Sequence, residues 1–282
     1  MWGLGQVIAF HVGFHKAASS YLQAAFTAHP EITFPIRGKT ARVFCAPEIA
    51  YSNDAARSYL DEHRADRLVL SHERLTGNPH SGFYDWAVVA NRIAIAAPNA
   101  RVVIAIREQR SMIVSTYKQY VRIGGTQSLE QYLRPINDYR LPRFDWRVLR
   151  YVEVVSLYKS LFKDVLVLPV ETLGSGGMEG LWRFLDVDPA PAISERINEG
   201  IPDEDIDGTR RRNLGVLDGS SLHDLRGIRP RALHRLLWLE PNRLPLAEET
   251  SRILGDAFSS SNAELSRIAG IDLAALGYQT PG

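Results

Sequence analysis

A lysine followed by small residues and two serines is the strongest candidate for chemistry in this chain. Lys16 follows an apolar run at residues 7–12 that ends at Gly13, and Ser19 and Ser20 open a pattern typical of a helix. Backbone N–H groups at a helix N-terminus have no partner within the helix and carry partial positive charge. Together with the lysine ammonium and the two hydroxyls, they predict a binding site for a phosphate or sulfate group.

A second anion-binding pair lies much further along the chain. Arg107 ends the most apolar run of the sequence, residues 101–106, and Ser115 follows eight residues later in a helical pattern. A guanidinium forms fork-like hydrogen bonds with phosphate oxygens. A serine within the following helix can turn its hydroxyl toward the same anion. The two elements come in an order and at a separation that one or two intervening α/β units would produce.

The first segment differs from the phosphate loop of nucleoside triphosphatases, G-x-x-x-x-G-K-[ST]. No glycine directly precedes Lys16, and Ala17 follows it in place of a serine or threonine. A kinase also needs an acidic magnesium ligand at a strand end. Here the run at 165–169 ends in Pro169, ahead of Glu171. A P-loop kinase and a nucleotide-binding protein without catalytic activity remain the alternatives.

Residues 12–23, VGFHKAASSYLQ, resemble the 5′-phosphosulfate loop of the sulfotransferases, which usually reads like K-[ST]-G-T-T-[WSY]-L. Ala17 and Ala18 stand where that family usually has Ser/Thr and Gly, and Ser19 and Ser20 stand for its two threonines. Alanine in place of the glycine has a steric cost if its φ is positive.

The resemblance implies a donor, 3′-phosphoadenosine 5′-phosphosulfate (PAPS), a product, 3′-phosphoadenosine 5′-phosphate (PAP), and no metal. Lys16 is then the catalytic cation, Tyr21 stacks on adenine, and Arg107 and Ser115 hold the 3′-phosphate. Sulfotransferases commonly add a basic loop over this phosphate, and TRRRN at 209–213 is the candidate here. The implied donor-binding residues are His15, Lys16, Ala17, Ala18, Ser19, Ser20, Tyr21, Arg107, Ser115, Arg211 and Arg212.

Transfer to a hydroxyl needs a base, and the segment RLVLSHERLTG at 67–77 offers two. In sulfotransferases that act on small molecules, a strand at this point ends in Thr-His, and in many bacterial relatives the same place reads Ser-Ser-Glu. His72 is the first choice because histidine titrates near neutral pH, and Glu73 is the second. Glu31 lies where other glycan sulfotransferases carry a catalytic glutamate, but its neighbours match those motifs poorly.

His11 and His15 are four residues apart, but a strand and a loop give them no shared helical face. With no third ligand evident, we expect no metal at this pair.

Alternating patterns predict the elements that position these residues. Apolar runs predict strands at 6–12, 67–71, 101–106 and 165–169, and helical patterns predict helices at 19–28, 54–64, 84–97, 108–123, 128–133, 146–162 and 177–185. We expect a three-layer α/β/α fold of the P-loop NTPase type, with a central parallel sheet of about four to five strands. We expect irregular structure at residues 30–50 and a loop at residues 198–221. The chain is treated as one domain, 1–282, with a helical C-terminal part from about 200.

Composition indicates a soluble enzyme. The 282 residues carry a formal net charge of +1, which gives no bulk attraction to nucleic acid polymers or membranes. The single Cys45 suits a reducing compartment, and we see neither a signal peptide nor an apolar run of ~20 residues. Abundant arginine and alanine are typical of GC-rich bacteria. We therefore expect a cytoplasmic bacterial enzyme whose acceptor is a hydroxyl on a carbohydrate, a lipid-linked sugar or a small metabolite.

Overall fold

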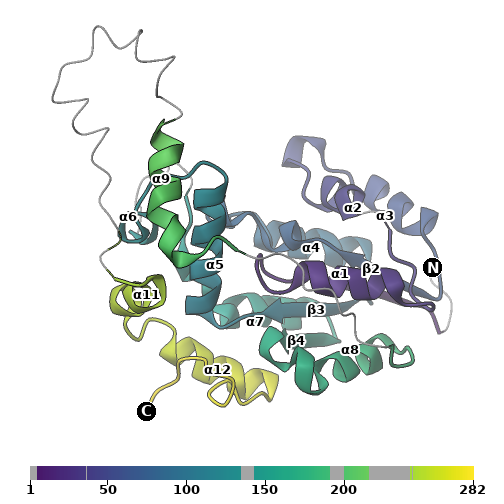
Figure 1. The fold of residues 1–282 in the computed structure, drawn as a ribbon. Coiled ribbons are helices and arrows are strands. Elements are labelled where there is room, and N and C mark those ends of the chain that lie inside the picture. The colour runs from purple at the N-terminus through teal and green to yellow at the C-terminus, as the bar shows by residue number, and fades with distance from the viewer. Residues whose placement is uncertain (1–4, 36, 135–142, 191–199, 216–241, 243) are drawn as a thin grey trace, which may run out of the picture.

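Four short buried strands form one parallel sheet in the computed structural model, which describes residues 5–35, 37–134, 143–190, 200–215, 242 and 244–282 (Figure 1). The strands are β1 (Val7–His11), β2 (Arg67–Ser71), β3 (Arg101–Ile106) and β4 (Val165–Pro169), in the order β2-β1-β3-β4. Continuous apolar sequences such as VVIAI form these strands because helices cover both faces of the sheet. The predicted α/β fold with a central parallel sheet is confirmed.

The strand order reverses at the carboxyl end of β1. The chain passes from β1 to β2 on one side and then returns across the sheet to β3 on the other. Right-handed crossovers in opposite directions put α1 (Ser19–Ala28) and α4 (Trp86–Ala96) on opposite faces. In open parallel sheets, ligands bind where the order reverses in this way.

Strand register sets the level of the loops at this edge. His11, the last residue of β1, pairs with Ser71, the last residue of β2, and on its other side with Val103 in the middle of β3. The loops after β1 and β2 therefore begin at the same height, while β3 continues to Ile106.

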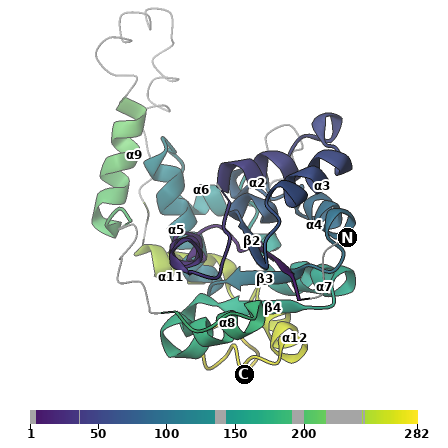
Figure 2. The ribbon, with the colours of Figure 1, turned by 90° about the vertical axis from the view of Figure 1, so that its right-hand side faces the viewer.

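The remaining helices gather at the two ends of the sheet. Near β2 lie α2 (Arg37–Phe44) and α3 (Asn53–Glu62), while α5 (Gln109–Arg122), α6 (Leu129–Leu133), α9 (Ile206–Gly215) and α11 (Leu246–Leu254) pack together at the other end (Figures 1 and 2). The helices α7 (Tyr151–Leu161) and α12 (Ser259–Ala269) pack on each other, and α8 (Met178–Leu185) follows β4. The predicted helical C-terminal part is present, and Gln109 of α5 bonds Asn262 of α12 at 2.6 Å.

Two stretches of the sequence were interpreted wrongly. Residues 30–50 were expected to be irregular, yet they contain α2, whose buried contacts come from Thr40 and Phe44, one helical turn apart. Residues 198–221 were expected to form a loop, yet α9 begins at Ile206. Besides Ile206 at its start, α9 buries a charged residue: Arg210 is fully buried, bonded to the Asp207 carboxylate at 2.6 Å and to a backbone carbonyl. A hydrophobic pattern cannot reveal a helix that buries a guanidinium.

Within the described ranges, no helix combines the length and the apolar character that crossing a membrane requires.

Gly13 leaves no room for a side chain at the turn after β1. A Cβ there would lie 2.5 Å from Nε2 of His11 and 2.9 Å from Cβ of Ala105, and both neighbours are buried. We expect Gly13→Ala to lower the free energy of unfolding by ~1–3 kcal/mol, measured by urea denaturation. The matched control is Gly180→Ala in α8, where a Cβ meets nothing within 4 Å and helix propensity favours alanine by up to ~1 kcal/mol. Equal losses in the two variants would contradict this packing.

Candidate functional site

The loop between β1 and α1 continues the sheet before it turns. The N–H of Val12 donates to the carbonyl of Val103 at 2.9 Å, and the N–H of Phe14 donates to that of Ala105 at 3.1 Å. Phe14 and Ala17 are fully buried and anchor the loop from below. The residues between and after them, Lys16 and Ala18, are therefore held partly exposed at the carboxyl edge of the sheet.

Backbone conformation in this loop is unusual for residues other than glycine. Lys16 has φ 64° and Ala18 has φ 55°, both in the left-handed region. Ala18 occupies the position where the sulfotransferase loop usually has glycine. Its positive φ is the conformation that has a steric cost for alanine. Each such residue costs ~1–2 kcal/mol, and the anchored neighbours hold the loop in spite of this cost.

The start of α1 offers hydrogen-bond donors. Its N-cap residue, Ala18, has no side chain able to accept from the first N–H groups of the helix. The Oγ of Ser19 is buried and finds no hydrogen-bond partner among the described residues. No described residue bonds the hydroxyl of Ser20 either. Unpaired N–H groups beside two hydroxyls fit a tetrahedral oxyanion.

Two other cations act on Lys16. Arg107 follows β3, and its Nη1 donates to the carbonyl oxygen of Lys16 at 3.3 Å. Burial lowers the pKa of Lys16, and the charges of Arg107 and Arg122 lower it further. In the part of the chain that the structure describes, no carboxylate forms an ion pair with any of these cations. Like charges held together in this way favour an anion between them.

Arg122 is a site residue that the sequence analysis missed. It is exposed at the end of α5, seven residues and so two helical turns after Ser115, on the same side of the helix. Ser115 itself is half-buried, and its hydroxyl bonds no described residue. The seven-residue spacing from Ser115 was the signal that could have identified Arg122.

The loop after β2 is tied to the loop after β1. The Thr76 hydroxyl donates to the carbonyl of Gly13 at 3.3 Å, and Nε2 of His15 donates to the carbonyl of Gly77 at 3.2 Å. His72 and Glu73, the two candidate bases, lie at the start of this second loop. The structure thus brings both candidates to the same edge of the sheet as the lysine loop.

The two candidate bases have different hydrogen-bond states. Nδ1 of His72 accepts the backbone N–H of Arg74 at 3.0 Å, so a neutral His72 carries its proton on Nε2. Its one basic lone pair is therefore engaged. Burial raises the pKa of Glu73, but its own backbone N–H, electrostatic interaction with the protonated forms of His72 and His15, and a hydrogen bond from Gln23 outweigh that effect and lower it. Glu73 is ionised at neutral pH and able to accept a proton.

The histidines of this region are not arranged as metal ligands to one ion. Nδ1 of His11 bonds the Ser71 hydroxyl at 2.7 Å, whereas His15 bonds Gly77 in the next loop. Burial lowers the pKa of both rings to about 4, so both are neutral at physiological pH.

Three sequence-predicted residues lie outside this cluster of contacts. Tyr21 is partly buried and packs against the hydrophobic core. Arg211 and Arg212 are exposed on α9, where Nη2 of Arg212 donates to the Thr209 hydroxyl at 2.8 Å. No contact among the described residues joins either arginine to Lys16 or Arg107.

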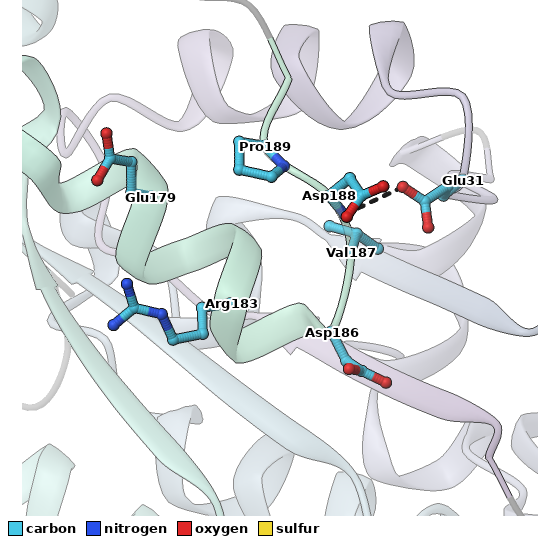
Figure 3. A pocket seen from close by; sticks show the side chains of 7 residues that line it. All are labelled: Glu31, Glu179, Arg183, Asp186, Val187, Asp188 and Pro189. Carbon is cyan, nitrogen blue, oxygen red and sulfur yellow. Dashed lines mark hydrogen bonds between the residues drawn. The ribbon is translucent and has the colours of Figure 1, made fainter.

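Glu31 lies at the opposite edge of the sheet. Its Oε1 accepts the backbone N–H of Asp188 at 3.0 Å, in a hollow of about 360 Å³ that also borders α8 (Figure 3). Figure 3 shows Glu31 pointing toward Asp188 from beyond the C-terminal end of α1, whereas Lys16 precedes the start of that helix. The acidic hollow is therefore separate from the lysine loop.

Glu171, which a magnesium-dependent kinase would need, is engaged in structural contacts. One of its carboxylate oxygens accepts the N–H of Glu108 at 2.9 Å, and the other accepts the Tyr278 hydroxyl at 3.0 Å. This arrangement gives the kinase alternative no support.

Comparison with known proteins gives a likeness of fold. No protein-family model and no curated protein matches the chain. Among solved structures, a sulfotransferase from Alicyclobacillus acidocaldarius matches at TM-score 0.62 and 19% identity, over 97% of this chain and 99% of that chain. Two weaker likenesses are to the sulfotransferase domain of the Synechococcus PCC 7002 olefin synthase, at TM-score 0.44, 13% identity and coverage of 96% and 99%, and to mouse sulfotransferase SULT7A1 complexed with PAP, at 0.45, 12% and coverage of 98% and 90%. The first of these likenesses shows that the chain has a sulfotransferase-like fold.

Removing the central cation should have opposite effects with and without an anion. We expect Lys16→Met to raise the Tm of the ligand-free protein at low salt by ~1–2 °C, because repulsion from Arg107 and Arg122 is relieved and solvent screens the rest. The same variant should lose most of the stabilisation that inorganic phosphate gives, measured by differential scanning fluorimetry. Lys39→Met, which removes an exposed lysine paired with Glu62, is the matched control and should keep the phosphate response. A Lys16→Met protein that responds to phosphate like the wild type would exclude Lys16 from the anion site.

Proposed function

We propose that this protein is a sulfotransferase that moves a sulfuryl group from PAPS to an acceptor hydroxyl. The observation that carries the proposal is the meeting of Lys16 and Arg107 at the start of α1, in the crevice where the strand order reverses. Two residues far apart in the sequence, each expected to bind a phosphate group of one nucleotide, are thereby brought within reach of one ligand. The sulfotransferase-like fold supports the same reading.

The residues present fit the two ends of this donor. The loop from His15 through Ala17 and Ala18, with Lys16, Ser19 and Ser20, would hold the 5′-phosphosulfate, since the hydroxyls of both serines bond no described residue and its lysine has no carboxylate partner within the described ranges. Arg107 and Ser115 would hold the 3′-phosphate. The aromatic ring of Tyr21 would contact adenine. Arg211 and Arg212 remain candidates for covering the nucleotide from α9.

The chemistry divides between a cation and a base. PAPS supplies an activated sulfuryl group. Lys16 stabilises the charge that develops on the departing 5′-phosphate as its bond to sulfur breaks. As the acceptor oxygen forms its bond to the same sulfur, Glu73 takes the hydroxyl proton. The products are the sulfated acceptor and PAP, and no metal enters the scheme.

Glu73 is the better base on the observed hydrogen bonds. The neutral ring of His72 has its lone pair at Nδ1 occupied by the N–H of Arg74 and presents only an N–H at Nε2. Glu73 lies beside it, with Oε2 at 3.8 Å from Nδ1 of His72, and about a third of its side chain is exposed. A carboxylate that is ionised and partly exposed can accept the proton directly. In this proposal Glu73 therefore replaces His72 as the first choice for the base.

The acceptor is proposed from the family resemblance alone: a hydroxyl on a carbohydrate, a lipid-linked sugar or a small metabolite. A bacterial origin and a cytoplasmic location belong to the same proposal.

Nucleotide binding should depend on the 3′-phosphate. At 100 times its dissociation constant, PAP should stabilise the protein by ~2.7 kcal/mol, which a thermal shift detects easily. Arg107→Ala should weaken the binding of PAP by ~2–4 kcal/mol in calorimetry, because a charged contact is lost. It should leave the weaker affinity for AMP, which has no 3′-phosphate, nearly unchanged. The control is Arg57→Ala, which removes an exposed arginine from α3. Equal binding of PAP by Arg107→Ala and the wild type would contradict the assignment, and stabilisation by ATP with magnesium in place of PAP would favour the kinase.

The base can be identified with two conservative variants. Glu73→Gln removes the proton acceptor and should lower transfer of ³⁵S-sulfate from PAPS by ~10²–10⁴-fold across a panel of sugar, alcohol and phenol acceptors. His72→Asn keeps a side chain that can accept the N–H of Arg74, as a capping residue does, and should retain most of the activity. PAP binding, measured in parallel, should survive in both. The opposite pattern of activities would assign the proton transfer to His72.

A further inference from the structure

A buried row of three polar side chains runs from β1 to α1 beneath the proposed base. Nδ1 of His11 lies 2.7 Å from Oγ of Ser71, and Nε2 of Gln23 donates to the same oxygen at 3.0 Å. All three residues are at most 3% exposed. They come from the end of β1, the end of β2 and the second turn of α1, so they join the strands to the helix that begins at the lysine loop.

The Ser71 hydroxyl links the other two side chains. Its oxygen accepts the N–H of Gln23, and it either donates its own proton to Nδ1 of His11 or accepts Nδ1–H, according to the tautomer of the ring. Burial lowers the pKa of His11 to about 4, so the ring is neutral at physiological pH in either tautomer. The Nε2 atom faces Gly13, where no side chain stands, and bonds no described residue.

The Glu73 carboxylate orients the Gln23 amide. One N–H of the amide donates to Ser71, and the side chain also forms a hydrogen bond with Glu73 that favours the carboxylate. An ionised carboxylate can only accept hydrogen bonds, so an amide turned over would place its oxygen against a negative charge. The amide therefore presents its nitrogen to Glu73 and to Ser71.

We propose that Gln23 is a positioning residue, locked by Ser71 and His11, that holds the Glu73 carboxylate in place beside the lysine loop. Because Gln23 lies one turn beyond Ser19 and Ser20 in α1, the helix that would bind the donor also sets the position of the base. This inference rests on the role of Glu73 in the proposed function. It assigns Gln23, Ser71 and His11 a part in catalysis that works through Glu73 and not through contact with substrate.

The charge state of Glu73 depends on every group that faces it. His72 precedes it in its own loop, His15 faces it from the lysine loop, and His11 interacts with it from β1. His11 and His15 are neutral at physiological pH, so near neutrality the Gln23 N–H is a donor to the carboxylate that does not titrate. Removing it should therefore raise the pH at which Glu73 takes up a proton.

The test measures the Glu73 carboxyl directly. In protein with ¹³C-labelled glutamate, the signal of Glu73 is assigned by its loss in Glu73→Gln and is titrated by NMR. In Gln23→Met, which keeps the side-chain length without the donors, its midpoint should move upward by about one pH unit, a tenfold change in proton affinity. The matched control is Thr27→Val, one turn further along α1, whose hydroxyl bonds only the Gln23 backbone carbonyl. Its midpoint should stay at the wild-type value.

Activity gives a second readout that simple loss of packing would not produce. In Gln23→Met the acid limb of the pH profile for transfer should move upward with the carboxyl midpoint, and the thermal shift with PAP should match that of the wild type. Ser71→Ala, which removes the partner that holds the Gln23 amide, should move the Glu73 midpoint and the acid limb of the pH profile in the same direction. It replaces Gln23→Met in the test if that variant does not fold. An unchanged Glu73 midpoint in a folded Gln23→Met or Ser71→Ala protein would overturn the inference. Failure of the wild type to bind PAP would instead overturn the proposed function, while the carboxyl titration would still decide the Gln23 contact.

Discussion

The site depends on the rest of the protein holding like charges together. Lys16 and Arg107 meet with no carboxylate between them among the residues described, so their repulsion has to be borne by rigid neighbours. Arg107 follows β3, which is paired on both sides, and its carbonyl accepts the hydroxyl of the fully buried Tyr151 at 2.7 Å. Lys16 is held between the buried Phe14 and Ala17. An anion bound here relieves that repulsion, so the apo fold stores part of the binding energy.

Backbone strain lies in the same few residues as the charge repulsion. Lys16 and Ala18 both have positive φ, although neither is glycine. Such conformations persist where the surrounding structure over-determines them. Here the N–H of Phe14 bonds Ala105 on one side of the strained residues, and the N–H of Leu22 bonds the carbonyl of Ala18 on the other. The loop is therefore fixed at both ends, which keeps its donors aimed before any ligand arrives.

Local sequence patterns predicted most of the sheet, because each strand is an unbroken apolar run bounded by polar or turn residues. The helix at 19–28 and the strands at 67–71, 101–106 and 165–169 have the predicted bounds. The proximity of Lys16 and Arg107 was also expected from the sequence, since each follows a strand of the same predicted parallel sheet, and Arg107 contacts the Lys16 carbonyl. The roles proposed for Gln23 and Arg122 could not be predicted from the sequence, because they depend on which residues another element brings beside them. The burial of Arg210 was missed for a similar reason: besides the Asp207 carboxylate in its own helix, it bonds the backbone carbonyl of Thr126, far along the chain.

Strand register links the two halves of the proposed chemistry. His11 pairs with Ser71, and this one contact decides that the loops after β1 and β2 begin at the same level and that their polar side chains meet beneath the crevice. A shift of β2 by one residue would turn Ser71 to the opposite face and carry Glu73 away from α1. The tie between Thr76 and Gly13 opposes that shift above the sheet, and the Gln23–Ser71 bond opposes it below. The relative position of Lys16 and Glu73, the proposed cation and base, is thus a consequence of how two strands pair, and polar contacts at the carboxyl edge protect it.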